Sequence, residues 1–387
     1  MPLIYIIAGE QSGDALGARL MAALRLVRPD LEFAGIAGPQ MQQQGASSLF
    51  PMGELAVMGL LEVLPRLLRL RRLLNDAVAD IAARRPDMVI TIDSPGFTLR
   101  VLARVAAMGI PRVHYVAPQV WAWRENRVRH YPGLWDRLLC LLPFEPAFFA
   151  RHGLEARFVG HPVLESGAGS GDGTRFRARH GLLPEARLLV LMPGSRIGEV
   201  TRLLPVFEAT LALLATRIPG LVPVVPVAEG VANAVRAATS AWPAAPVVVT
   251  ELADKHDAYA AATVALTKSG TSTLELALAG VPMAVTYRVN PVTAAIARRL
   301  FVVEHVALVN LLAGRTVVPE LLQQDCNPVR LAAELAVLLT DPAAVAGQRA
   351  AFRAVIASLA PPDGTPSAAA ARQVLDLLDA RQDAYVS

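Results

Sequence analysis

Residues 3–17 read LIYIIAGEQSGDALG, an apolar run that passes into a glycine-rich turn. The apolar run is typical of a buried strand, and the stretch after Gly9 has the composition of a helix. The glycines at 9, 13 and 17 do not follow the spacing G-x-G-x-x-G, so a dinucleotide fingerprint is not supported. The chain therefore starts with a strand, a turn and a helix.

This alternation of a short apolar run and a longer amphipathic stretch continues along the chain. The runs that we predict to be strands are 3–8, 33–37, 88–93, 112–116, 137–142 and 157–160, and then 188–195, 221–227, 246–250, 263–269 and 281–287. Strands that alternate with helices are typical of a parallel sheet with crossover helices. The sequence thus predicts the α/β class, with two doubly wound parallel-sheet domains.

The length and one Gly/Ser-rich stretch predict the domain boundaries. A chain of 387 residues exceeds what one hydrophobic core usually supports. The stretch ESGAGSGDG lies in residues 165–175, which we interpret as a flexible linker. We expect the first domain over 1–164, the second over 176–366, and a C-terminal helix over about 367–387 that can pack back onto the first domain.

The composition narrows the class of protein. Hydrophobic residues make up 53% of the chain and charged residues 18%, which excludes disorder. The mean hydropathy of +0.41 is high, yet no uninterrupted apolar stretch reaches the ~18 residues of a spanning helix. The N-terminus has no basic leader and no cleavage site, so we expect a cytoplasmic protein.

The charged residues and the cysteines argue against nucleic-acid binding, disulfide bonds and a metal site. The net charge of +4 suits an anionic partner, but nearly all of the basic residues are arginines scattered along the chain. No basic stripe interleaved with aromatic residues is present, so we expect no nucleic acid. Cys140 and Cys326 lie far apart without nearby histidines, which predicts neither a disulfide framework nor a metal site.

Acidic residues follow two of the predicted strands of the first domain. In parallel sheets, ligands bind beyond the carboxyl ends of the strands. Asp93 ends the run MVITID, where a buried charge would have to be solvated, paired or shifted in pKa. Glu10 and Asp14 follow the first strand, and Ser12 or Asp14 could instead cap the next helix.

Two loops of the second domain have the features of phosphate sites. Each leaves a strand through glycine, hydroxyl and cationic residues, with N–H groups available at the start of a helix. Glu275 suits the hydroxyls of a ribose, although Ser272 and Glu275 also fit a structural capping box. Two such loops in one domain suit a nucleoside diphosphate. The sequence contains no Asp-x-Asp motif, so a metal ion bridging the diphosphate is not indicated. The predicted residues are Gly194, Ser195, Arg196, Ser269, Gly270, Thr271, Ser272, Thr273 and Glu275.

Residues 55–74 form a nearly continuous apolar run that becomes basic at its end. One interpretation is a core helix with a solvated end. The other is a patch in which leucines meet acyl chains and arginines meet anionic head groups. Its residues are Met58, Leu60, Leu61, Leu64, Arg66, Leu67, Leu68, Arg69, Arg71 and Arg72.

Together these motifs resemble one family, lipid-A-disaccharide synthase. The resemblance covers nearly the whole chain and rests on AGEQSGDALGA, GIAGPQM, LAVMGLLEVLPRL, IDSPGF, HYVAPQVWAWRENRV, LLPFE, FVGHPV, LMPGSRIGEV, KSGTSTLELAL and NLLAGRTVVPELLQ. It implies a GT-B glycosyltransferase of Gram-negative lipid A synthesis, with two Rossmann-like domains facing across a cleft.

The resemblance also implies the reaction and its surroundings. Such enzymes join UDP-2,3-diacylglucosamine to 2,3-diacylglucosamine 1-phosphate (lipid X), giving a β-1,6-linked disaccharide and UDP, with inversion. No metal or redox cofactor is expected. The implied location is peripheral, on the cytoplasmic face of the inner membrane, and the resemblance leaves the oligomeric state open, a homo-oligomer included.

Inversion requires a general base for the acceptor hydroxyl and positive charge for the departing diphosphate. Asp93 is the first choice of base, with Glu10, Asp14 and His114 as rivals, and Asn310 is expected near the ribose. Many family members carry a second acidic residue where this chain has Gly96. That departure leaves open which carboxylate acts as the base.

Two other functions remain open on the sequence. A UDP-sugar epimerase would share the architecture and the nucleotide site, but it would have no need of the patch at 55–74. A nucleotide-sugar or lipid-binding protein without activity is the other alternative, and Gly96 is the feature that favours it.

Overall fold

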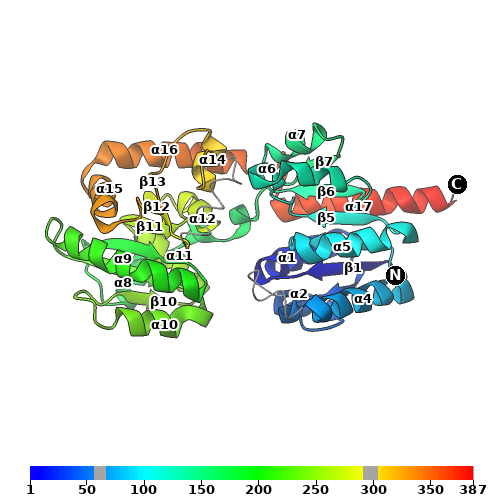
Figure 1. Ribbon diagram of the computed structural model, residues 1–387, viewed down its shortest axis with the longest axis horizontal. Helices are drawn as coiled ribbons and strands as arrows, with labels where there is room; N and C mark the ends of the chain where they lie inside the picture. The colour runs from blue at the N-terminus through cyan, green and yellow to red at the C-terminus, as the bar shows by residue number, and fades with distance from the viewer. Residues whose placement is uncertain (56–66, 291–303, 387) are drawn as a thin grey trace. The chain divides into compact units, whose positions relative to one another are not determined.

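The computed structural model describes residues 1–55, 67–290 and 304–386. The chain divides into two compact units, which are described separately (Figure 1). Unit 1 comprises Met1–Pro162 and Leu359–Ser387, and unit 2 comprises Val163–Ser358. The predicted α/β class is confirmed, because each unit is built on one parallel sheet.

The described residues of unit 1 contain a seven-stranded sheet in the order β3-β2-β1-β4-β5-β6-β7. All of its pairings are parallel, as in Ile4↔Phe33 between β1 and β2 and Ile4↔Met88 between β1 and β4. The strands are β1 (Leu3–Ala8), β2 (Glu32–Ile36), β3 (Ser47–Ser48), β4 (Met88–Ile92), β5 (Arg112–Tyr115), β6 (Arg137–Cys140) and β7 (Ala156–Phe158).

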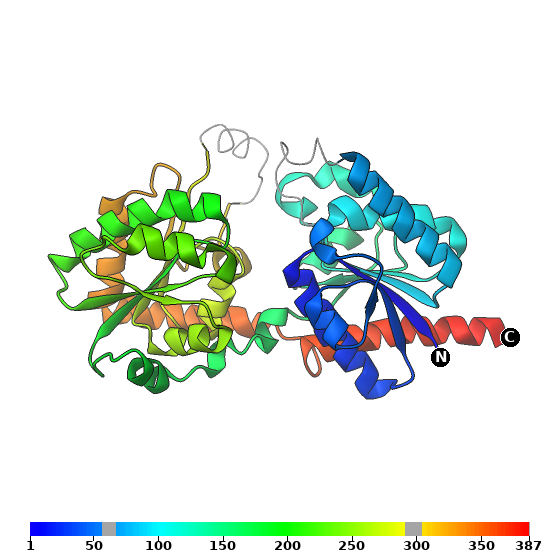
Figure 2. The same cartoon turned by 90° about the horizontal axis from the view of Figure 1, so that it is seen from below.

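Helices cover both faces of this sheet. They are α1 (Gln11–Val27), α2 (Pro39–Gln43), α4 (Leu67–Arg84), α5 (Pro95–Val105), α6 (Val120–Trp123), α7 (Glu145–Ala150) and α17 (Pro366–Val386). α1 packs against α17 on one face, and α4 packs against α5 on the other (Figure 2). The core between these layers is made by apolar strand residues such as Ile4, Ile6 and Ile90.

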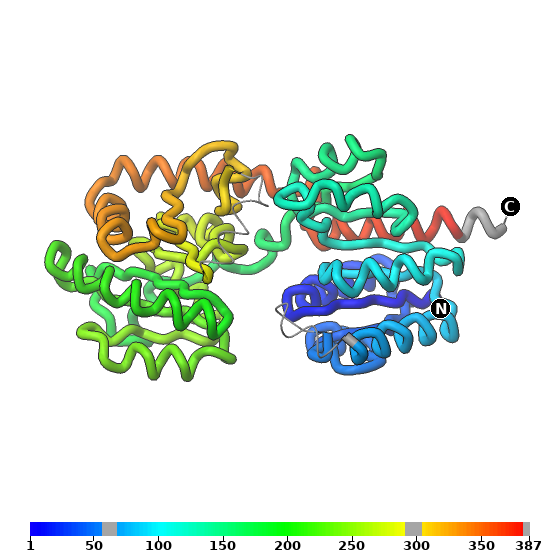
Figure 3. Tube along the Cα trace, in the orientation of Figure 1, coloured from blue at the N-terminus to red at the C-terminus, as the bar shows by residue number. Residues whose placement is uncertain are grey.

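The C-terminal helix is an integral part of unit 1. Ala370, Val374 and Leu378 of α17 are buried in the same core as the strands. The Asp379 carboxylate lies 3.1 Å from the Arg28 guanidinium at the end of α1. In Figure 3 the C-terminal helix, coloured red, lies in the same unit as the blue N-terminal elements.

The described residues of unit 2 contain a six-stranded parallel sheet in the order β10-β9-β8-β11-β12-β13. Its strands are β8 (Arg187–Met192), β9 (Leu221–Pro226), β10 (Val247–Val249), β11 (Val264–Lys268), β12 (Met283–Tyr287) and β13 (Glu320–Leu322). The edge strands β3 and β13 are the two that the sequence did not predict, because neither is a purely apolar run: β3 consists of two serines, and β13 begins with Glu320.

The helices of unit 2 also form two layers. They are α8 (Gly173–Arg179), α9 (Ile197–Ala215), α10 (Glu229–Thr239), α11 (Leu252–Ala261), α12 (Ser272–Leu278), α14 (Leu308–Ala313), α15 (Pro328–Thr340) and α16 (Pro342–Ser358). α9 packs against α10 and α15 over one face, and α8 packs against α11 over the other (Figure 2). Among the described helices, none combines the length and apolar character needed to cross a bilayer.

The segment interpreted as a flexible linker, 165–175, is instead packed onto α11. A Cβ at Gly171 would lie 1.9 Å from the His256 carbonyl oxygen, so only glycine fits there. Arg175 donates two hydrogen bonds of 2.6 Å to Asp257. The Gly/Ser composition therefore reflects close backbone packing rather than flexibility, which composition alone cannot distinguish.

Candidate functional site

Each sheet has one point at which the strand order reverses. In unit 1 the chain runs from β1 outward to β3 and returns with β4 beside β1, and in unit 2 it returns with β11 beside β8. The loops that follow such neighbouring strands diverge, and ligands of open α/β sheets bind there. The relevant loops begin at Gly9 and Asp93 in unit 1 and at Pro193 and Ser269 in unit 2.

Asp93 lies in a tightly constrained turn at the end of β4. Asp93 and Ser94 both have positive φ, 49° and 47°, which is uncommon for residues other than glycine. The Asp93 N–H donates to the Tyr115 carbonyl at 2.9 Å, and the Thr98 hydroxyl donates to the Asp93 carbonyl at 2.7 Å. Such backbone conformations persist where surrounding contacts hold them, and they are common at functional sites.

Contacts across the reversal point fix this turn further. A Cβ at Gly9 would lie 2.4 Å from the Ser94 hydroxyl oxygen, so the loop after β1 passes directly over the loop after β4. Burial raises the pKa of the Asp93 carboxyl above its ordinary value, and the Ser94 N–H partly offsets this. A partly buried carboxyl with a raised pKa at such a point has the character of a general base.

Asp14 caps a helix, as the structural alternative predicted, but the helix is not the one that was expected. Its buried carboxylate accepts the N–H groups of Gly38 at 3.0 Å, Gln40 at 2.9 Å and Met41 at 3.0 Å. It therefore caps α2 rather than its own helix, and a Cβ at Gly38 would come within 2.5 Å of it. Because three donors occupy its oxygens, Asp14 is a structural residue rather than a rival base.

His114 is also unsuited to act as the general base. Its ring is fully buried in β5 and stacks on Trp135 with centroids 5.7 Å apart, and its Nδ1 lies 2.8 Å from the Thr91 hydroxyl. Burial lowers the pKa of His114 to about 3. A neutral ring inside the core cannot reach a substrate hydroxyl, so of the rivals only the partly exposed Glu10 remains beside Asp93.

Glu145 is an acid that the sequence analysis did not single out. It is buried after β6 and accepts N–H groups from Leu141 at 3.1 Å, Leu142 at 2.9 Å and the Trp121 indole at 3.1 Å. Burial raises its pKa to about 7, although these three donors oppose the shift. Its place directly after a strand, in the motif LLPFE, was the available signal.

The β8–α9 loop of unit 2 is organised around Glu199. Gly194 has φ 115°, and a Cβ there would lie 2.3 Å from Glu199 Oε2. That oxygen accepts the Ser195 N–H at 3.2 Å. The other oxygen, Oε1, lies 3.0 Å from Lys268 Nζ and 3.6 Å from Arg196 Nη1. The predicted Ser195 and Arg196 thus meet two residues that sequence reasoning missed, Glu199 and Lys268.

The β11–α12 loop runs beside it. Gly270 has φ 155°, and a Cβ there would be 3.9 Å from Lys268 Nζ. The Ser269 hydroxyl donates to the Val306 carbonyl at 2.9 Å, and the Thr273 hydroxyl to the Gly270 carbonyl at 2.8 Å. The helix begins at Ser272, where the first N–H groups have no intrahelical acceptors.

The capping-box interpretation of Ser272 and Glu275 is wrong. Thr271 is the N-cap and makes no side-chain capping bond within the described residues. The Glu275 carboxylate instead lies 2.7 Å from Lys255 Nζ and accepts the Tyr259 hydroxyl at 3.1 Å. Glu275 is therefore held as a charged acceptor between α11 and α12.

Asn310 does not have the place expected for a nucleotide contact. Its fully buried side chain accepts the N–H groups of Val317 at 2.7 Å and Val318 at 2.9 Å. Its amide nitrogen donates to the Val318 carbonyl at 2.9 Å and to Glu320 at 2.7 Å. The oxygen and the nitrogen of the side-chain amide both hold this loop, so Asn310 is a structural residue rather than a nucleotide contact.

The predicted patch is only partly described. Met58, Leu60, Leu61, Leu64, Arg66 and the side chain of Leu67 lie outside the described residues. In the first turns of α4, Leu68 is 73% exposed and Arg71 and Arg72 are exposed, whereas Arg69 pairs with Glu54 at 3.0 Å. The described part of this segment thus combines an exposed leucine with exposed cations.

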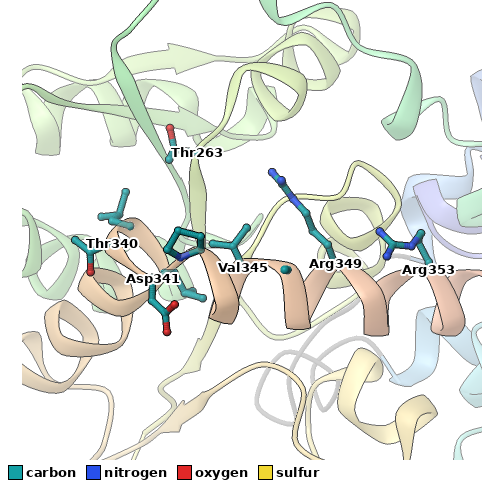
Figure 4. A pocket seen from close by; sticks show the side chains of 10 residues that line it. Thr263, Thr340, Asp341, Val345, Arg349 and Arg353 are labelled. Carbon is teal, nitrogen blue, oxygen red and sulfur yellow. The ribbon is translucent and has the colours of Figure 1, made fainter.

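A hollow of about 500 Å³ lies at the other end of the unit 2 sheet (Figure 4). Thr263, which precedes β11, lies across from Val345 and Arg349 of α16. The Arg349 Nε donates to the Gly280 carbonyl at 3.0 Å. This is the amino end of the strands, away from the loops where ligands of parallel sheets bind.

Solved structures resemble this fold over nearly its full length. One is the S. aureus MnaA-UDP co-structure, with TM-score 0.64 and 13% identity, covering 95% of this chain and 94% of that one. Another is the calicheamicin glycosyltransferase CalG4, with TM-score 0.61 and 18% identity, covering 98% of each chain. At these identities the likeness establishes the fold alone, and it confirms the predicted GT-B architecture.

Sequence comparisons identify the family. A model of the lipid-A-disaccharide synthetase family matches residues 4–373. The lipid-A-disaccharide synthase of Granulibacter bethesdensis is 60% identical over 97% of this chain and 99% of that protein. The corresponding protein of Pseudomonas aeruginosa is 43% identical over 98% of each. With a family model and full-length relatives in agreement, this chain belongs to the lipid-A-disaccharide synthase family.

Proposed function

We propose that this glycosyltransferase of lipid A synthesis joins UDP-2,3-diacylglucosamine to lipid X, with inversion, and releases UDP. Family membership over residues 4–373 supports the reaction class. One observation supports assigning the nucleotide site to particular residues. At the point where the strand order of unit 2 reverses, the Ser195 N–H, Arg196 and Lys268 all contact the Glu199 carboxylate. The Ser195 N–H and the Arg196 guanidinium are donors of the kind that bind a diphosphate.

We assign the UDP part to the two loops of unit 2. Gly194 and Gly270 both have positive φ, and because glycine has no Cβ, the backbone at each can approach a ligand closely. Arg196 is 55% exposed and available to a phosphate. In this proposal Glu275 accepts the ribose hydroxyls, while the diphosphate binds the loop groups Ser195, Arg196, Ser269, Thr271, Ser272 and Thr273.

We assign the general base to Asp93 of unit 1. Inversion is one displacement, in which the acceptor oxygen forms a bond to the anomeric carbon as the bond to the UDP oxygen breaks. The acceptor proton passes to the Asp93 carboxylate, and the diphosphate leaves with the electron pair. A raised pKa makes Asp93 a stronger base than an ordinary aspartate, which supports this assignment.

Gly96 is compatible with the turn that holds Asp93. A Cβ at Gly96 would meet no described atom within 4 Å, and the residue is exposed. A larger side chain would therefore fit without moving the turn. Asp93 keeps its position whether or not a second acid follows it, and Glu10 is the alternative carboxylate at the same reversal point.

We also propose peripheral association with the cytoplasmic face of the inner membrane through the start of α4. The exposed Leu68, Arg71 and Arg72 have the chemistry for acyl chains and anionic head groups. Both substrates are acylated, so this placement would bring the enzyme to them.

The test is a reaction with both acylated sugars. We expect UDP release that depends on lipid X, together with a disaccharide whose new anomeric centre is β by NMR. The structural neighbours include a UDP-GlcNAc 2-epimerase from Neisseria meningitidis, with TM-score 0.61. Epimerised sugar without disaccharide would support that alternative, and tight UDP binding without turnover would support an inactive binding protein.

A further inference from the structure

The chain uses lysine at only two positions, and both lie at the candidate nucleotide site. All but two of its 37 basic residues are arginines. Lys255 pairs with Glu275 at 2.7 Å, and Lys268 pairs with Glu199 at 3.0 Å. Both pairs adjoin α12 or the loop before it. The role of Lys268 follows from the groups that share Glu199 with it.

Glu199 is shared unequally by two cations. Its side chain is 10% exposed, and Lys268, which is 21% exposed, lies 3.0 Å away. Arg196 is 55% exposed and lies 3.6 Å from the same oxygen. Since ion pairs weaken with distance and solvent exposure, Lys268 is the dominant partner of Glu199.

The space around Lys268 favours a compact cation. Its Nζ would be 3.9 Å from a Cβ at Gly270 and lies 5.6 Å from the centre of the Tyr287 ring. An ammonium is a point charge, whereas a guanidinium is a wide planar fork. A lysine can therefore neutralise Glu199 beneath Gly270 without filling the space beside the loop.

We propose that Lys268 is a positioning residue that acts through Glu199 to leave Arg196 available to the diphosphate. Without Lys268, the nearly buried Glu199 carboxylate would have Arg196 as its remaining close cation and would repel an incoming phosphate. With Lys268 present, the negative charge of Glu199 is paired, and its carboxylate continues to accept the Ser195 N–H. This inference rests on the proposed function, because it requires UDP to bind these loops.

The alternative is that Lys268 binds the phosphate itself, and a double-mutant comparison separates the two. The variants are Lys268→Met, Lys268→Arg, Glu199→Gln and the double variant Lys268→Met with Glu199→Gln. Arg236→Met is the matched control, since it removes one positive charge from an exposed position of α10 in the same unit. UDP affinity is measured by calorimetry, and kcat and KM by UDP release.

We expect Lys268→Met to weaken UDP binding about tenfold or more, because Arg196 is then drawn to Glu199. KM should rise more than kcat falls. Lys268→Arg should restore only part of the affinity, because it keeps the charge but its wider guanidinium fills the space beside the Gly270 loop. Arg236→Met should leave UDP affinity unchanged. The double variant should bind UDP within about threefold of Glu199→Gln, since only a long-range charge is then lost.

A double variant that binds UDP at least tenfold more weakly than Glu199→Gln would overturn the inference and make Lys268 a direct phosphate contact. Unchanged UDP binding in Lys268→Met would overturn it as well. If Lys268→Met does not fold, the UDP affinities of the double variant and of Glu199→Gln still distinguish the two roles of Lys268. Arg196→Ala, measured alongside, tests the proposed function separately: if it too leaves UDP binding unchanged, the nucleotide site lies elsewhere.

Discussion

Replacing Asp14 tests whether this acid is structural or catalytic. Its carboxylate accepts three N–H groups, and the bonds from Gly38 and Met41 are buried. Asp14→Ala leaves those two donors without an acceptor, at roughly 1–3 kcal/mol each, so we expect a loss of about 2–6 kcal/mol. Asp14→Asn keeps one acceptor oxygen and the shape of a capping side chain, and it should cost about 1–2 kcal/mol.

Thermal unfolding followed by calorimetry measures these losses. For a unit of this size, each kcal/mol lowers Tm by roughly 2–4 °C, so we expect Asp14→Ala to lower Tm by roughly 4–24 °C. Asp76→Asn, at an exposed position of α4 in the same unit, is the matched control and should stay within about 0.5 kcal/mol of the original. UDP affinity should not change in any of them, because the proposed nucleotide loops belong to unit 2.

Activity gives the result that would refute this reasoning. At a temperature where Asp14→Asn is folded, we expect turnover close to that of the unaltered protein. A variant with unchanged Tm and turnover reduced a thousandfold would mean that Asp14 takes part in the chemistry after all. In that case the three hydrogen bonds would hold the Asp14 side chain in place without contributing measurably to stability.

Three further predictions concern the other candidate groups. Arg196→Ala should weaken UDP binding about tenfold or more by calorimetry, since it removes a charged donor, and unchanged binding would place the diphosphate elsewhere. Burial raises the pKa of Glu145 to about 7 in the folded state, so stability should fall as pH rises from the unfolded value near 4.5 to about 7. Melting curves between pH 5 and 8 should therefore show a smaller decrease for Glu145→Gln than for the original, and equal slopes would exclude a buried, proton-binding Glu145. Replacing Leu67 and Leu68 with Ser should reduce binding to anionic vesicles in a sedimentation assay, and undiminished binding would remove the start of α4 from the membrane contact.

The strands were predictable because buried parallel strands are short apolar runs followed by turn residues. The loops at the carboxyl ends of β1, β4, β8 and β11 were found for the same reason, and with them Asp93 and Gly194. The strand order, which brings β4 beside β1 and β11 beside β8, is not a local property of the sequence. It needs the three-dimensional structure.

The misplaced residues have one physical cause in common. Asp14 and Asn310 are polar residues near strand ends or loops, which is also where catalytic groups occur. Their partners, such as Gly38 and Val318, are set by tertiary folding, so the sequence could not show that their hydrogen bonds were already made. His114 was misjudged because its burial in β5 follows from the helices that cover the sheet.

Glu199 was missed although it stands in the quoted motif LMPGSRIGEV. Its position in the first turn of α9 predicts only a favourable interaction with the helix dipole. The contact joins the first turn of α9 to Lys268 at the end of β11, two places that are far apart in the sequence of unit 2. The rarity of lysine in an arginine-rich chain was the signal that could have pointed to this pair.

The central claim is that Asp93 of unit 1 serves as base for a reaction whose nucleotide binds in unit 2. Turnover and UDP affinity of Asp93→Asn, measured on one preparation, test it most directly. We predict turnover reduced by about 10²–10⁴-fold, with UDP affinity unchanged. Lipid X-dependent UDP release at the original rate in Asp93→Asn would contradict the account.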